Sequence, residues 1–84
     1  MSSSVQILIK GRFWPIPGAK TKDIAPNAVQ ITIPVSPDLK KRTRRGERAE
    51  DWDGAIFLVD DEESEPAVGS GEGKGTVVVT AFFL

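Results

Sequence analysis

The chain of 84 residues contains no cysteine, no histidine and no tyrosine. Without cysteine it can form neither disulfides nor thiolates, and without histidine as well nearly all zinc sites are excluded, because zinc prefers thiolate and imidazole ligands. A catalytic nucleophile would have to be Ser, Thr or Lys without a histidine base. A domain this small also has little room for a ligand cavity. We therefore expect a protein that is not an enzyme and that uses no metal, cofactor or small-molecule substrate.

Long apolar runs are also missing. No stretch approaches the roughly 20 apolar residues that a membrane-spanning helix needs, so we expect no membrane partner. The N-terminal residues 1–4 do not begin a basic segment followed by an apolar one, so they do not form a signal peptide. Together with the absence of cysteine, this favours an intracellular, cytoplasmic protein.

The chain's length allows one domain over residues 1–84 with a thin margin of stability. Domains of this size often add disulfides, a metal or a partner subunit to their core. Of these supports, self-association is the one that the composition leaves open. The formal net charge of −1, from 11 Lys and Arg against 12 Asp and Glu, favours no particular partner. The charges are segregated along the chain, however, and the segregation carries more information than the sum.

Four segments have the apolar patterns of strands, and we expect strands at residues 5–13, 28–34, 55–59 and 76–84. The last of these is apolar on both faces, which predicts that both of its faces are covered. We expect the segments at 55–59 and 76–84 to pair as one antiparallel hairpin, and the segments at 5–13 and 28–34 to form a second pair.

Three other segments carry weaker signals. Ser36, Pro37 and Asp38 suit the start of a helix, but Leu39 is the sole apolar residue that follows, so residues 37–45 form either a short surface helix or a loop. Residues 1–4 are expected to be a loose terminus. Residues 61–75 are rich in acids and glycines and are expected to form a flexible hairpin loop.

These elements predict an all-β domain, or a β-rich domain with one short surface helix. The expected architecture is a small sandwich or a partly open barrel of four to five antiparallel strands. So few short strands rarely cover a strand as apolar as 76–84, and an uncovered one is an aggregation hazard that a second chain would remove. The candidate apolar interface residues are Val78, Phe82 and Leu84.

A basic run precedes the strand at 55–59, and an acidic run at 60–65 follows it. The basic residues that could bind a partner or phosphates are Lys40, Lys41, Arg42, Arg44, Arg45 and Arg48. Three aromatic residues, Phe13, Trp14 and Trp52, could stack on single-stranded bases or line an interface. Acids between residues 47 and 53 would repel a nucleic-acid backbone. The acidic run could pair with the basic run, or both could meet a neighbouring molecule.

The favoured function is a non-enzymatic protein-interaction or assembly module, oligomeric or docked on a larger protein, such as a structural subunit or a small protein inhibitor. The charge blocks would give such an interface orientation and association rate more than affinity. The alternative is a nucleic-acid binder that holds a single strand or a phosphate backbone with residues 40–48.

Overall fold

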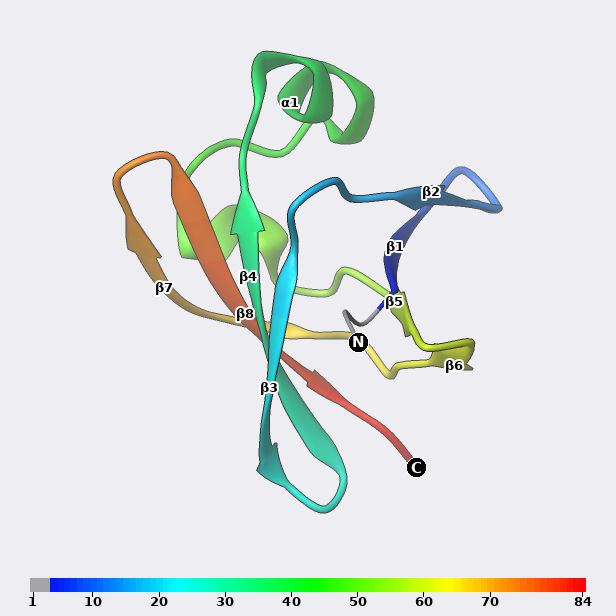
Figure 1. The fold of residues 1–84 in the computed structure, drawn as a ribbon. Coiled ribbons are helices and arrows are strands. Elements are labelled where there is room, and N and C mark those ends of the chain that lie inside the picture. The colour runs from blue at the N-terminus through cyan, green and yellow to red at the C-terminus, as the bar shows by residue number, and fades with distance from the viewer. Residues whose placement is uncertain (1–3) are drawn as a thin grey trace.

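The computed structural model describes residues 4–84 and consists mostly of β-structure. Two four-stranded antiparallel sheets and one short helix make up the fold, which is not a closed barrel (Figure 1). The first sheet has the strand order β2 (Arg12–Pro15), β1 (Val5–Ile9), β5 (Phe57–Val59) and β6 (Glu62–Glu63). The second sheet has the order β3 (Lys20–Ala25), β4 (Ala28–Pro34), β8 (Thr76–Phe82) and β7 (Val68–Gly73). The β-rich class predicted from the sequence is confirmed.

One buried apolar cluster draws side chains from both sheets. It includes Ile7 and Phe57 from the first sheet and Ile31 and Val79 from the second, all fully buried. Trp52, from the 3-10 helix η1 (Ala49–Trp52), is fully buried in the same cluster. The cluster explains why the alternating apolar positions of these strands face inward.

The strand β8 is buried on one face only. Its residues alternate between the core, which receives Val77, Val79 and Ala81, and the outer face of the sheet. On the outer face Phe82 remains 39% exposed. The prediction that both faces of this segment are covered is therefore wrong for the isolated chain.

The predicted strand pairs are also wrong. The strand β5 pairs with β1, with Val59 opposite Val5, and not with β8. The strand β8 lies between β4 and β7, with Phe82 opposite Ala28. Short hairpins supply most partners: β1 with β2, β3 with β4, β5 with β6 and β7 with β8. A two-residue loop costs less closure entropy than the long loop that the predicted pairing required.

Two of these hairpins have turns in which both residues have positive φ. Lys10 and Gly11 join β1 to β2 with φ of 49° and 80°, so residues 5–13 form two strands where one was expected. Asp60 and Asp61 join β5 to β6 with φ of 50° and 68°. Two positive φ values characterise the type I′ turn, whose twist matches that of the flanking strands.

The predicted flexible loop at 61–75 is wrong as well, because it contains β6 and β7. Contacts with η1 hold β7 in place. Glu72 accepts a hydrogen bond through Oε2 from the Ala49 N–H at 2.6 Å, and Asp53 accepts one through Oδ1 from the Gly69 N–H. These tertiary bonds order a strand that has almost no apolar side chains.

The segment after β4 forms the helix α1 (Pro37–Thr43). Of the two alternatives for residues 37–45, a short surface helix or a loop, the structure shows the helix. Ser36 caps it by accepting a hydrogen bond through Oγ from the Leu39 N–H at 3.1 Å. Leu39 is 5% exposed and anchors the helix on the core. The helix ends at Arg44, whose φ of 60° is left-handed.

The predicted loose terminus falls largely outside the described residues, which begin at Ser4. Ser4 itself is held to the turn between β5 and β6. Its N–H donates to Oδ1 of Asp60 at 2.8 Å, and its carbonyl accepts from the N–H of Asp60 at 2.9 Å.

Candidate interaction surfaces

A shallow groove joins the helix α1 to the first sheet. The groove, about 290 Å³ in volume, is lined by Ile9, Lys10, Arg12, Trp14 and Arg42, and is called the basic groove below. The guanidinium carbon of Arg42 lies 4.4 Å from the centroid of the Trp14 ring, and that of Arg12 lies 5.2 Å from it. Both distances allow cation–π attraction. The groove therefore presents three cationic side chains around one aromatic ring.

Other members of the basic run are engaged within their own segment. Lys40 pairs with Glu47 at 3.4 Å, and Arg48 pairs with Glu50 at 2.9 Å. Arg45 donates through its guanidinium to the carbonyl of Asp51 at 2.7 Å. Exposed pairs of this kind contribute about 0–1 kcal/mol each, so they leave the basic residues available to a stronger partner.

The three predicted aromatic residues are separated by the fold. Trp14 lines the basic groove and is half-buried. Phe13, also half-buried, is its neighbour on β2 and pairs with Leu8. Trp52 is fully buried, and its Nε1 donates to the carbonyl of Gly46 at 2.9 Å. Trp52 is thus a core residue whose ring faces are not available for stacking.

The predicted apolar interface residues lie along β8 and just beyond its end. Phe82 and Val78 are on the outer face of β8, and Leu84 follows them and is fully exposed. Val68 of β7 is 51% exposed and lies opposite Thr80, which places it on the same outer face. We call Val68, Val78 and Phe82 the outer apolar patch. Val68 was not predicted as an interface residue, because it lies in the segment 61–75 for which a flexible loop was predicted.

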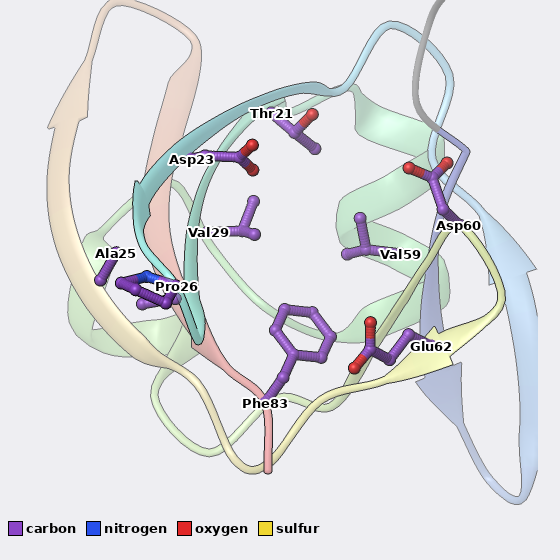
Figure 2. A pocket seen from close by; sticks show the side chains of 10 residues that line it. Thr21, Asp23, Ala25, Pro26, Val29, Val59, Asp60, Glu62 and Phe83 are labelled. Carbon is purple, nitrogen blue, oxygen red and sulfur yellow. The ribbon is translucent and has the colours of Figure 1, made fainter.

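A cleft of about 570 Å³ lies between the strands β3 and β4 on one side and the turn between β5 and β6 on the other. Figure 2 shows the side chains of Val29, Val59 and Phe83 pointing into it. Three carboxylates, from Asp23, Asp60 and Glu62, lie around these apolar side chains. We call this the acidic cleft.

The acidic cleft was not foreseen from the sequence. No strand was predicted for the segment that contains Asp23. The acids at 60–65 were predicted to lie in, or directly before, the flexible loop at 61–75. Within residues 4–84, no three carboxylates come close enough together to hold a metal ion.

The basic groove and the acidic cleft lie at opposite ends of both sheets. The strand β1 begins at Val5, opposite Val59 of the cleft, and ends at Ile9 of the groove. In the second sheet, β4 begins at Ala28 in the cleft and ends at Pro34, just before α1. Figure 1 shows α1 and the turn between β3 and β4 far apart in the same way.

The acidic and basic runs therefore do not pair with each other. In the part of the chain that the structure describes, every salt bridge joins residues between Asp38 and Glu50.

Comparison of the chain with protein-family models, curated proteins and solved structures finds no match. Between residues 4 and 84, the structure has no helix with the length and apolar character needed to cross a membrane.

Proposed function

We propose that this chain is a non-enzymatic protein-interaction or assembly module that docks another protein, either a second copy or a larger partner, on the outer apolar patch. The observation that carries the proposal is the one-sided burial of β8. Its inner residues Val77 and Val79 are fully buried, whereas Phe82 on the outer face is 39% exposed. Exposed apolar patches on small domains often mark interaction sites.

Small side chains surround the patch. Thr76 and Thr80 lie on the same outer face of β8, and Gly71 lies opposite Val78. The larger Val68 and Phe82 are therefore the prominent exposed apolar side chains of this face. We also propose that the two sheets pack against each other across the shared core as an open sandwich. The outer face of the second sheet would then be free to bind the partner.

The test is the mass of the native protein, measured by light scattering and by native mass spectrometry of the protein isolated from its source. We expect a mass above that of one chain, either as an oligomer or as a complex with a larger protein. The variant Phe82→Asp should lower that mass, because a buried carboxylate would be placed in the interface. Lys74→Asp, in the turn between β7 and β8, is the control and should leave it unchanged. A wild-type chain that is monomeric and carries no partner would overturn the proposal.

The basic groove supports a second candidate function, the binding of single-stranded nucleic acid. A base would stack on the Trp14 ring by displacing one of the two guanidinium groups that lie over it, those of Arg42 and Arg12. The displaced guanidinium group and Lys10, which lines the same groove, would then be cations for the phosphates on either side. Binding of a generic oligonucleotide should then weaken steeply as salt is added, since each neutralised phosphate releases a counterion.

Replacing Arg12 and Arg42 with Ala should weaken this binding without unfolding the domain. The matched control replaces Lys20 and Lys74 with Ala, which also removes two positive charges but leaves the groove unchanged. The absence of measurable binding at low salt would remove this candidate. Recording absorbance at 260 nm on the protein isolated from its source tests the same point without a chosen oligonucleotide.

A further inference from the structure

We propose that the acidic cleft of one copy of this chain receives the basic groove and the exposed end of α1 from a second copy, so that copies join head to tail. This contact does not involve the outer apolar patch. In it, the acidic cleft and the basic groove both bind another copy of the same chain. Four observations carry the inference: the distance between the two ends, their opposite charges, the chemistry of the cleft and the position of α1.

The acidic cleft and the basic groove of one chain are too far apart to form ion pairs with each other. They are separated by the length of β1 in the first sheet and of β4 in the second, which have five and seven residues. At about 3.3 Å per residue, these strands span roughly 13 and 20 Å. An ion pair needs its charged atoms within about 4 Å. Any direct contact between the two ends must therefore join different molecules.

The charges that line the acidic cleft and the basic groove are opposite. The residues that line the acidic cleft include three carboxylates and neither lysine nor arginine. The residues that line the basic groove include three cations and neither aspartate nor glutamate. The nearest carboxylate that pairs there is Asp38, which is 3.8 Å from Arg42 and highly exposed. Complementary surfaces of this kind direct two molecules into one orientation and suppress others.

The cleft suits lysine and arginine side chains in particular. Val29, Val59 and Phe83 offer apolar surface to their aliphatic stems, while Asp23, Asp60 and Glu62 lie within the same cleft to receive their charged heads. Carboxylates accept charge-assisted hydrogen bonds from guanidinium groups, often two at once. The volume of about 570 Å³ admits more than one such side chain.

The helix α1 is placed to supply these side chains. It lies at the edge of the molecule, as Figure 1 shows, and its residues Lys41 and Arg42, together with Asp38, line a second shallow depression beside the basic groove. The cleft and the groove are different surfaces, so after the first contact one copy keeps its groove free and the other keeps its cleft free. A contact of this heterologous kind builds a ring when its rotation closes and a filament when it does not.

Two charge-reversed variants test the inference. The cleft variant carries Asp23→Lys and Glu62→Lys, and the groove variant carries Lys10→Asp and Lys41→Glu. Neither removes Arg42 or Asp60, which make contacts that the fold uses. A control variant with Lys20→Glu and Lys74→Glu has the same net charge as the groove variant but changes residues that line neither end. Circular dichroism confirms that each variant is folded before its association is measured.

Association is measured by sedimentation at about 50 mM and about 500 mM salt, which bracket strong and weak screening. We expect the wild type and the control to associate more strongly at low salt than at high salt, because salt screens the charge contacts between the cleft and the groove. Each charge-reversed variant alone should associate at least roughly tenfold more weakly, because like charges then meet in the interface. An equimolar mixture of the two variants should recover association, because the unchanged groove of the cleft variant can enter the unchanged cleft of the groove variant.

Variants that associate as the wild type does, a mixture that shows no recovery, or a wild type that stays monomeric at both salt concentrations would each overturn the head-to-tail contact. The outcome for the outer apolar patch is separate. Association that is lost in Phe82→Asp but unchanged in both charge-reversed variants would retain the patch and remove the head-to-tail contact. Association that is lost in both charge-reversed variants but unchanged in Phe82→Asp would support the head-to-tail contact and contradict self-association through the patch.

Discussion

Arg42 in α1 lies over the ring of Trp14 in β2, with 4.4 Å between the guanidinium carbon and the ring centroid. This contact joins two elements that are far apart in the chain, and it ties a helix with one buried side chain to the first sheet. It also decides the shape of the basic groove, because both residues line it.

Replacing Arg42 with Ala should therefore loosen α1 and uncover Trp14. An exposed cation–π contact contributes about 0.5–1 kcal/mol, and we expect the free energy of unfolding to fall by that amount. Acrylamide should quench Trp14 fluorescence more strongly in the variant, while Trp52 stays protected because it is fully buried. Lys41→Ala is the control for loss of charge on the helix. Unchanged quenching in Arg42→Ala would show that the contact does not persist in solution.

The close approach of β7 to η1 makes a second prediction. A Cβ atom on Gly69 would overlap the carbonyl oxygen of Ala49, whereas a Cβ on Gly71 would meet nothing within 4 Å. Gly69→Ala should cost at least about 1–3 kcal/mol, as overpacked sites usually do, and Gly71→Ala should cost little. Urea unfolding of the two variants measures the difference. Equal stabilities would mean that η1 does not pack on β7 as the structure shows.

The last three residues should differ sharply in their contribution to stability. Phe83 is 9% exposed and donates its N–H to the carbonyl of Asn27 at 2.8 Å, whereas Phe82 and Leu84 are exposed. Phe83→Ala should cost about 3–5 kcal/mol, as for other buried phenylalanines.

Phe82→Ala is the matched comparison and should cost less than about 1 kcal/mol, since its side chain faces outward. Thermal unfolding at a protein concentration where the chain is monomeric separates these costs from any effect on association. A larger loss for Phe82 than for Phe83 would contradict the register of β8.

The N-terminal cap of α1 gives a fourth prediction. Ser36→Ala removes the acceptor for the Leu39 N–H and should cost about 1 kcal/mol, while Ser36→Asp keeps an acceptor and should retain most of the stability. The comparison is made by thermal unfolding, with helix content followed by circular dichroism. Equal stabilities for the Ala and Asp variants would indicate that the cap is not formed.

Strands with a clear apolar pattern were predictable, and strands without one were not. Alternation at Val29, Ile31 and Ile33 correctly indicated β4, because a half-buried strand needs that period. No such pattern exists in β3 or β7, which are polar or glycine-rich along most of their length. They form because their backbone pairs with a neighbouring strand, a contribution that the side-chain pattern does not record.

The candidate surfaces were predictable to a similar extent. The basic run and the exposed Phe82 could be named from the sequence, because charge and apolar character are properties of single residues. The joining of Arg42 to Trp14, and of Asp23 to Asp60 in one cleft, depends on which strands are neighbours. The predicted strand pairs were wrong, so the side chains that lie together in the groove and in the cleft could not be predicted.

The amino-acid sequence by itself determined the β-rich class and the segregation of charge, because both follow from local composition and spacing. It indicated Ser36 as a helix cap but left residues 37–45 open between a helix and a loop. Only the tertiary structure decided that β8 lies between β4 and β7, that Trp52 is buried and that the two charged ends are separated. The physical reason is that an apolar strand can pair with any apolar neighbour. The choice among neighbours depends on turn geometry and on the packing of the whole core.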